Sequence, residues 1–370
     1  MSNISRVFSD FGQSIWLDNI DRNLLTCGGL KDLLAVGLRG VTSKPSIFHK
    51  AITGSADYDD SIRELLQADH EMDDEALYEQ LTIQDVKMAA DILQPVYASS
   101  DGTDGFVSLE VSPHIAFDAD ASIESARHLW RSVDRANLMI KVPATAAGLL
   151  AMETLIAEGI NVNVTLLFSI DRYKALIDSY IRALSHNPHP DKVASLASFF
   201  ISRVDAKVDA ALGEIGTDDA LALKGKIAIA NAKLAYQYFK EKFASAAFKN
   251  EARRGAQQQR PLWASTSVKN AEYSDVLYVD QLIGSDTVNT LPPQTLDAFQ
   301  FHGELDATLE NDVHAAQQAL DSLHALGIDL AQITEELEQE GIQKFADSYD
   351  QLLASLKDKR LLVNTQHVEK

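Results

Sequence analysis

The stretch NLMIKVPAT at residues 137–145 places Lys141 inside an otherwise apolar segment. A buried ammonium is costly unless it is paired or loses its proton. Removal from water favours the neutral amine, which can attack a carbonyl and form a Schiff base. Lys141 is therefore a candidate nucleophile. The alternative is a purely structural salt bridge between Lys141 and either Glu110 or Asp18.

Polar residues in other strand-like runs share the expected orientation of Lys141. Side chains alternate across a strand, so each run divides into an apolar face and a more polar face. The apolar faces are expected to meet helices and the polar faces to point inward. A single inward serine or threonine is usually a satisfied core hydroxyl, but a set from five strands near one end predicts a site. Its members are Asp18, Glu110, Lys141, Asn163, Thr165 and Ser202.

This set has the groups that class I aldol chemistry requires. A protonated imine on Lys141 would accept the electron pair released when a neighbouring carbon–carbon bond breaks. Asp18 is a suitable base for the β-hydroxyl proton, and Glu110 and Thr165 could hold the water for imine formation and hydrolysis. Asn163 and Ser202 are suitable donors to substrate hydroxyls.

Other chemistries have little support in the sequence. There is no GxGxxG or GxxxxGK[ST] motif for a nucleotide and no GxSxG nucleophile motif. The histidines lack metal-ligand spacing, and a single cysteine cannot build a zinc cluster. The expectation is an enzyme without a metal or a cofactor.

Eight strand-like runs alternate with amphipathic helical patterns, which predicts an α/β fold with a parallel sheet. Eight strands with none left over favour a closed (β/α)8 TIM barrel, with an open doubly wound sheet as the alternative. Helical patterns in the intervals between the strand-like runs cover residues 120–133, 147–159 and 170–184. The runs are residues 14–19, 38–44, 106–112, 138–145, 160–169, 197–205, 261–267 and 286–292.

A single domain over residues 1–370 is the simplest organisation. Residues 45–105 are too long for one helix, and they predict a helical insertion after the second strand that includes a helix over 74–96. A further long helix is expected over 224–248. Two more helical segments from about 305 to 358 predict a C-terminal extension packed against the barrel.

Composition limits the class of partner. The 370 residues include 33 Lys+Arg and 54 Asp+Glu, a formal net charge of −21, which disfavours nucleic acid and anionic membranes. Cys27 is the sole cysteine, and neither a secretory signal nor a membrane-spanning run is evident. A cytoplasmic protein acting on a small molecule is expected. The sequence does not choose between a monomer and a homodimer.

The motifs, taken in order, resemble those of the transaldolase family. NLMIKVPATAAGLLAMETLIAEGINVNVTLLFS resembles its Schiff-base strand and the following segment, and WLDN, GVTSKPSIF and FVSLEVSP resemble its first three strands. ASFFISRVDAKVD and the segment PLWASTSVKNAEYSDVLYVDQLIGSDTVNTLPPQTLDAF are similar to the longer bacterial branch. The resemblance runs from about residue 12 to residue 300.

The resemblance implies transfer of a dihydroxyacetone unit in the non-oxidative pentose phosphate pathway. Sedoheptulose 7-phosphate and glyceraldehyde 3-phosphate would give erythrose 4-phosphate and fructose 6-phosphate. Lys141 matches the Schiff-base lysine and Asp18 the acid/base. Glu110 and Thr165 match the pair that handles water, and Asn163 and Ser202 match donors to the bound ketose.

Two positions depart from the family pattern. Lys44 stands in TSKP where the family usually has an asparagine that contacts the substrate, so a second cation is expected near Lys141. The phosphate-binding residues are less clearly matched, with Arg203, Ser265 and Lys269 as the principal candidates beside Lys207 and Ser267. Two alternatives stay open: fructose 6-phosphate aldolase-type release of dihydroxyacetone, which depends on how water is held near Glu110 and Thr165, and a catalytically weak barrel acting as a binding protein, which Lys44 suggests.

Overall fold

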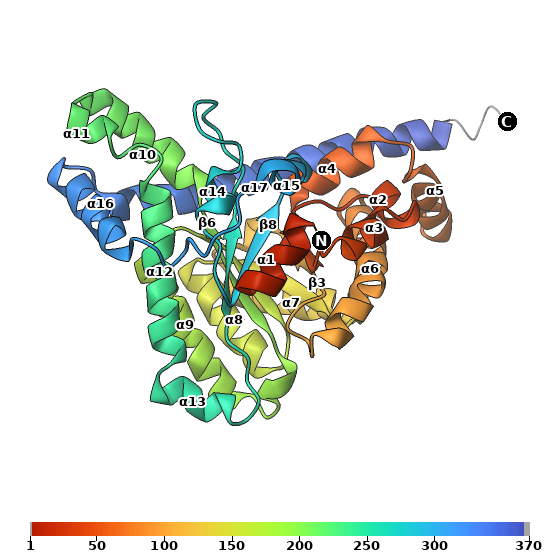
Figure 1. The fold of residues 1–370 in the computed structure, drawn as a ribbon. Coiled ribbons are helices and arrows are strands. Elements are labelled where there is room, and N and C mark those ends of the chain that lie inside the picture. The colour runs from red at the N-terminus through yellow and green to blue at the C-terminus, as the bar shows by residue number, and fades with distance from the viewer. Residues whose placement is uncertain (1, 366–370) are drawn as a thin grey trace.

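The computed structural model describes residues 2–365, in which eight parallel strands close into a barrel (Figure 1). Each strand pairs with its sequence neighbours, and β8 closes the barrel by pairing with β1. The predicted (β/α)8 barrel and its eight strands are confirmed. The strands are β1 (Gln13–Leu17), β2 (Gly40–Val41), β3 (Phe106–Glu110), β4 (Leu138–Pro143), β5 (Val162–Leu167), β6 (Ser195–Phe200), β7 (Arg260–Ala264) and β8 (Thr287–Leu291).

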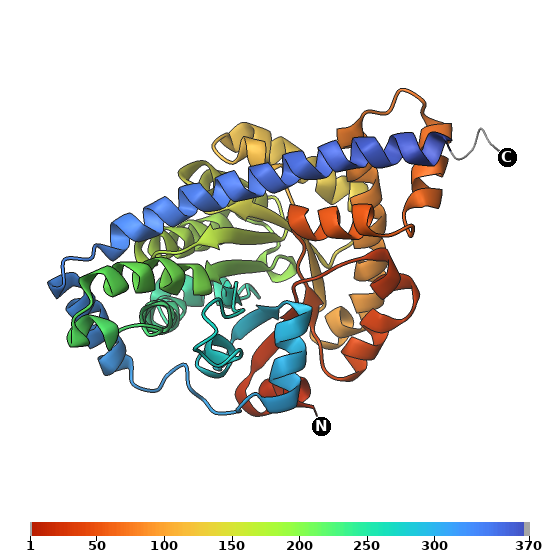
Figure 2. The ribbon, with the colours of Figure 1, turned by 90° about the horizontal axis from the view of Figure 1, so that it is seen from above.

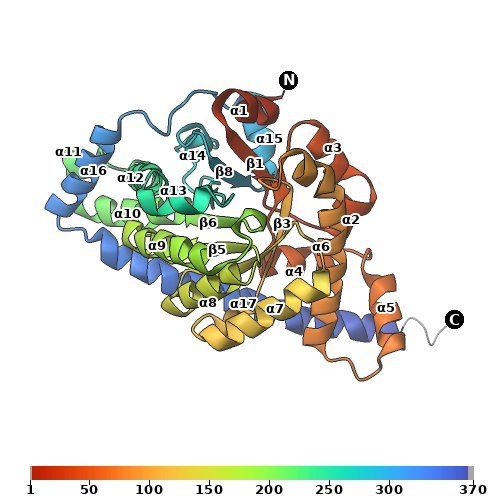
Figure 3. The same cartoon turned by 90° about the horizontal axis from the view of Figure 1, so that it is seen from below.

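Helices surround these strands, as the view from below shows (Figure 3). Those before β4 are α1 (Asn3–Phe11), α2 (Arg22–Thr26), α3 (Gly29–Ala35), α4 (Pro45–Gly54), α5 (Asp59–Ala68), α6 (Asp74–Ser99), the 3-10 turn η1 (Pro113–Ile115) and α7 (Ala119–Val133). Those that follow are α8 (Ala146–Ala157), α9 (Ile170–His186), η2 (Pro190–Lys192), α10 (Ser202–Ile215), α11 (Asp218–Leu221), α12 (Ile227–Phe243), α13 (Ala246–Ala252), α14 (Leu277–Asp280), α15 (Pro293–His302), α16 (Val313–Ala325) and α17 (Leu330–Thr365).

Every strand ends before the last residue of its predicted run, and the sixth strand-like run and one predicted helix differ most from the structure. The strand expected over 197–205 stops at Phe200, and α10 begins at Ser202. Val204, Val208 and Leu212 recur every four residues and are all buried, so a helix is needed to bury them together. The helix expected over 224–248 is broken after Phe243, where Ser245 caps the start of α13.

Helix α17, 36 residues long, crosses the end of the barrel at which the strands terminate (Figure 2). It contacts α4, α5, α6, α10 and β5. Ion pairs hold it at both ends: Lys359 pairs with Asp59 at 2.9 Å, and Lys207 of α10 pairs with Glu336 at 2.6 Å. The C-terminal segment is thereby placed over the barrel mouth.

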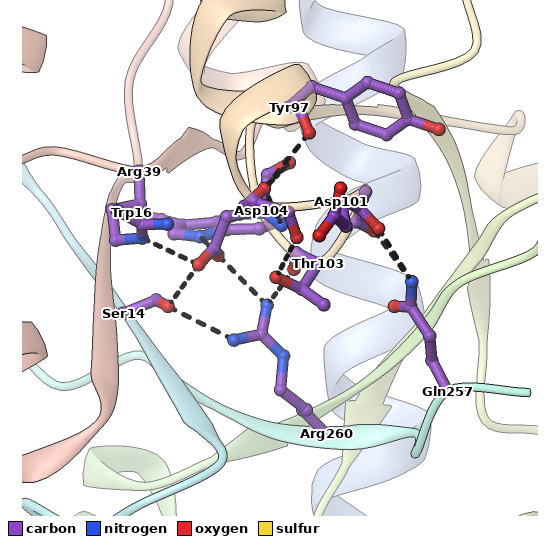
Figure 4. A network of polar contacts seen from close by, with 11 residues as sticks. Ser14, Trp16, Arg39, Tyr97, Asp101, Thr103, Asp104, Gln257 and Arg260 are labelled. Atoms are coloured by element: carbon purple, nitrogen blue, oxygen red, sulfur yellow. Dashed lines mark hydrogen bonds and ion pairs between the residues drawn. The ribbon is translucent and has the colours of Figure 1, made fainter. Parts of the chain in front are cut away.

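The opposite end of the barrel is closed by a polar network around Asp104 (Figure 4). This buried carboxylate accepts hydrogen bonds from Ser14 at 2.7 Å and Trp16 at 3.1 Å, and it pairs with Arg39 at 2.7 Å and Arg260 at 3.0 Å. Burial opposes ionisation, but Arg260 and Arg39 outweigh it and lower the pKa of Asp104. Residues at this face of a TIM barrel serve stability.

None of the helices within residues 2–365 has a stretch long and apolar enough to traverse a bilayer.

Candidate active site

A cavity of about 200 Å³ opens among the C-terminal ends of the strands, the end at which TIM barrels place their active sites. Many of the predicted site residues meet there. Those lining the cavity are Asp18, Lys44, Lys141, Thr165, Arg203, Ser265, Ser267 and Lys269. Glu110, Asn163 and Ser202 lie next to these residues without lining the cavity. The candidate Lys207 does not join the site, because it pairs with Glu336 and Glu340 of α17.

Lys141 sits on β4 between two polar neighbours in the barrel register. Glu110 of β3 and Asn163 of β5 are its partners on either side. The Lys141 side chain is 7% exposed, and its Nζ atom lies 3.7 Å from Glu110 Oε2. The same Nζ donates a 3.1 Å hydrogen bond to the Ser43 carbonyl oxygen. The amine is thus held at the floor of the cavity by one carboxylate and one backbone oxygen.

Glu110 and Thr165 carry oxygens that are available for a further contact. Within the described residues, the buried Glu110 Oε2 and Thr165 Oγ1 atoms have no hydrogen-bond partner. Burial raises the pKa of Glu110, an effect that the nearby Lys141 and Lys44 cations partly offset. A carboxyl group with a raised pKa is well suited to accept and return a proton during catalysis.

Asn163 belongs to a hydrogen-bonded chain across three strands. Its amide nitrogen donates to Ser108 Oγ at 3.1 Å, and its amide oxygen accepts from Ser198 Oγ at 2.6 Å. These contacts fix the orientation of the Asn163 amide beside Lys141. Ser198 lines the cavity directly.

Asp18 follows β1 and is held by hydrogen-bonding groups on both carboxylate oxygens. Thr42 Oγ1 donates to Oδ1 at 3.0 Å, and the Lys44 ammonium forms an ion pair with Oδ2. Thr290 of β8 contacts the same Thr42 hydroxyl at 2.7 Å. Lys44 therefore lines the cavity, where a second cation was expected, and its immediate partner is Asp18.

Arg203 is presented to the cavity by the first turn of α10. Its guanidinium carbon lies 5.2 Å from the ring centre of Phe200 and 5.9 Å from that of Phe345 on α17. Among residues 2–365 it makes no hydrogen bond or ion pair. Burial lowers the pKa of Arg203, and Glu340 partly offsets this effect. Its donors are free for an anion.

Lys269 and the serines near it complete the cationic side of the cavity. Lys269 Nζ donates to Ser267 Oγ at 2.9 Å, and Ser202 Oγ lies 3.1 Å from Ser265 Oγ. Burial lowers the pKa of Lys269, and the neighbouring Lys44 and Arg203 cations lower it further. Lys44, Arg203 and Lys269 are thus close enough for their charges to interact.

Several cavity residues were not predicted from the sequence to be part of the site. Phe345 carries no local signal, because its helix joins the cavity only through the tertiary fold. Thr290 shares a strand face with apolar Val288, so alternation does not distinguish it. Further cavity residues without a predicted role are Thr42, Ser198, Phe200, Ala264 and Pro292.

No group of three or more histidine, cysteine, aspartate or glutamate side chains with metal-binding geometry occurs within residues 2–365.

The chain matches the family model described as transaldolase/fructose-6-phosphate aldolase over residues 15–356. It is 46% identical to a transaldolase of Thiobacillus denitrificans, over 96% of this chain and 99% of that protein. It is also 46% identical to a transaldolase of Mycolicibacterium smegmatis, over 92% and 93%, and 45% identical to one of Thermobifida fusca, over 93% and 95%. With a lysine at the floor of the barrel cavity and similarity along nearly its whole length, the chain belongs to the transaldolase/fructose-6-phosphate aldolase family.

Proposed function

We propose that the protein is a transaldolase that moves a dihydroxyacetone unit between sugar phosphates through a Schiff base on Lys141. The observation that carries this proposal is the Lys141 amine, which is buried beside Glu110 and opens onto a cavity that also contains Asp18. The relatives at 44–46% identity are named transaldolase, which favours transfer over aldolase-type release.

The arrangement supports each step of the reaction. The Lys141 amine adds to the ketose carbonyl, and loss of water gives a protonated imine. The C3–C4 bond then breaks, its electron pair enters the imine to form an enamine, and the C4 hydroxyl proton passes to Asp18. The enamine attacks an acceptor aldehyde, which regains a proton from Asp18, and water hydrolyses the new imine. Glu110 and Thr165 are the proposed residues for positioning that water.

The cationic side of the cavity is the proposed phosphate site. Arg203 presents donors that no protein acceptor engages within the described residues, and its ring neighbours hold the guanidinium plane in position. Lys269, Ser265 and Ser267 lie on the adjacent segment after β7. Guanidinium and ammonium groups together suit a phosphate dianion.

A transfer assay with fructose 6-phosphate and erythrose 4-phosphate tests the proposed function. We expect sustained formation of glyceraldehyde 3-phosphate and sedoheptulose 7-phosphate only when both substrates are present, because the enamine needs an acceptor to turn over. Coupled oxidation of NADH measures the triose phosphate. Sustained triose phosphate and free dihydroxyacetone without erythrose 4-phosphate would instead indicate an aldolase. Absence of product under both conditions would refute both enzyme activities.

Lys44→Asn is expected to raise kcat by about threefold to tenfold, the equivalent of about 1 kcal/mol. In the native chain the Lys44 ammonium occupies one oxygen of Asp18, and it competes there with the substrate hydroxyl. Asparagine retains a polar side chain without the charge. Steady-state kinetics of the transfer reaction measure the change.

Lys31→Asn is the charge-matched control, because Lys31 is exposed on α3 away from the cavity. Its kcat should match that of the native protein. A fall in kcat for Lys44→Asn would show that Lys44 assists the reaction instead of competing with it.

A further inference from the structure

The segment between β7 and α14, residues 265–276, carries Ser265, Ser267 and Lys269 but contains no helix or strand. Beyond its first residues, which Thr266 fixes through a 3.0 Å hydrogen bond to Asn289, this segment needs other contacts to hold its position. Asp275 supplies one through a 2.7 Å contact with His302, and two tyrosines supply others. Tyr273 lies within the segment, and Tyr278 lies in the short helix α14 that follows it.

Both tyrosines donate hydrogen bonds to carboxylates of α10. The Tyr273 hydroxyl donates to Asp209 Oδ2 at 2.7 Å, and the Tyr278 hydroxyl donates to Asp205 Oδ2 at 3.0 Å. Asp205 and Asp209 are four residues apart, so they lie on one face of the helix. We call these two hydrogen bonds the Tyr–Asp clasp. It joins the segment that carries Lys269 to the helix whose first turn carries Arg203.

The two carboxylates are themselves fixed in place. The second oxygen of Asp205 accepts from the Ala228 backbone nitrogen at 2.7 Å, and that of Asp209 accepts from the Gly225 backbone nitrogen at 3.0 Å. Each carboxylate therefore joins a tyrosine of the segment or of α14 to the start of α12. A tyrosine hydroxyl bound to such an acceptor has little freedom to move.

The burial of Asp205 costs free energy, because its carboxyl group is removed from water. Asp205 is 1% exposed. It accepts hydrogen bonds from Ala228 and Tyr278, but it has no ion-pair partner among the described residues. Burial raises its pKa to about 7, with the hydrogen bonds from Ala228 and Tyr278 acting in the opposite direction. A buried carboxyl without a cation is an expensive way to stabilise a fold. Such groups are more readily explained by positioning a functional segment.

We propose that the Tyr–Asp clasp positions Lys269 opposite Arg203 and so determines the affinity of the cavity for phosphorylated substrates. This inference rests on the proposed function, which places a phosphate between these two side chains. The four clasp residues do not line the cavity. They are positioning residues, and their effect is confined to the phosphate end of the substrate.

The test is the double variant Tyr273→Phe and Tyr278→Phe. Each phenylalanine keeps the ring and removes only the hydroxyl. We expect the KM for glyceraldehyde 3-phosphate to rise by about fivefold to tenfold, the scale of a lost hydrogen bond between the segment and its support. The kcat should stay within about twofold, since Lys141 and Asp18 are unaffected. The KM for unphosphorylated glyceraldehyde should not change.

Tyr180→Phe is the matched control, because Tyr180 is fully buried on α9 and donates a 2.9 Å hydrogen bond to the Gln257 carbonyl oxygen. It removes a comparable hydroxyl without touching the clasp, so both KM values should match those of the native protein. An unchanged KM for glyceraldehyde 3-phosphate in the folded double variant would overturn the proposal. An equal rise in the KM values of both acceptors would also overturn it, because that pattern indicates a general loosening of the cavity and not a defect at the phosphate end.

Binding of inorganic phosphate, measured by calorimetry, separates this proposal from the proposed function. The double variant should bind phosphate more weakly than the native protein even if the native protein shows no transfer. If Lys269→Ala weakens phosphate binding and the double variant does not, the clasp is refuted while the phosphate site stands.

Discussion

Replacing Lys141 by methionine is expected to lower kcat by about 10⁴-fold or more, because the covalent route then has no nucleophile. The variant should also lose the adduct that borohydride traps. With fructose 6-phosphate, reduction of the native protein should add a dihydroxyacetone-derived group to the peptide that contains Lys141. Intact-mass and peptide mass spectrometry measure both outcomes.

The fold should survive this substitution. Methionine is close to lysine in length, and it leaves Glu110 as the nearest titratable group. Because burial already raises the pKa of Glu110, this carboxyl can take up a proton once the Lys141 cation is gone. The thermal unfolding of the variant then shows whether a loss of activity reflects chemistry or misfolding.

The chain offers a closely matched control in Lys233→Met. Lys233 is 6% exposed on α12 and donates a 2.9 Å hydrogen bond to the Asn311 carbonyl oxygen, much as Lys141 donates to that of Ser43. It lies outside the cavity. Lys233→Met should keep both turnover and the trapped adduct. An adduct that persisted in Lys141→Met would assign the nucleophile to another residue.

The eight strand-like runs separated by helical patterns predicted the barrel, and side-chain alternation within those runs predicted which polar residues point into it. A charged residue in an apolar strand is rare because it is costly, so Lys141 was conspicuous from its neighbours alone. The alternation of side chains across each strand then placed Thr165 and Asp18 on the same side of the barrel as Lys141, and all three line the cavity. Alternation works here because every strand of a closed barrel has one face toward helices.

The same rule was less reliable where the strands end. Ser202 was placed on a strand face, whereas it is the first residue of α10, and the adjacent Arg203 therefore reaches the cavity. Neighbouring residues of a strand point to opposite faces of the sheet, whereas neighbouring residues of a helical turn do not point in opposite directions. Contacts from distant helices cannot be predicted from local periodicity at all. Phe345 is the example, since α17 reaches the site only after crossing the barrel mouth.

Close packing explains how that helix reaches the site. Gly341 of α17 lies against the barrel end, where an added Cβ atom would stand 2.9 Å from Leu166 Cδ2 and 3.5 Å from Arg203 Nη1. A residue with a side chain would require the Leu166 side chain or α17 itself to shift. Glycine at this position is therefore part of how the site is covered, a role that the sequence around residue 341 does not indicate.

Glu110→Gln is expected to lower kcat by about 10²- to 10⁴-fold, the usual contribution of a positioned acid–base group. Glutamine keeps the size of the side chain and can still contact Lys141, but it cannot carry a proton between water and the imine. Formation and hydrolysis of the Schiff base should therefore become slow, while the trapped adduct still forms on Lys141 after long incubation. Single-turnover kinetics separate this defect from a loss of binding.

The pH profile gives this prediction a second measurement. Burial raises the pKa of Glu110 above its ordinary value of 4.5, so its ionised, proton-accepting form is lost as the pH falls through that raised pKa. If Glu110 acts as the base, the native kcat/KM should fall on the acid side at a higher pH than an exposed glutamate would produce. The Glu110→Gln variant should lack this acid limb.

Glu338→Gln is the matched control, because Glu338 is also partly buried with a raised pKa but pairs with Arg172 outside the cavity. Its rate and pH profile should equal those of the native protein, and an acid limb retained in Glu110→Gln would assign the base to another group.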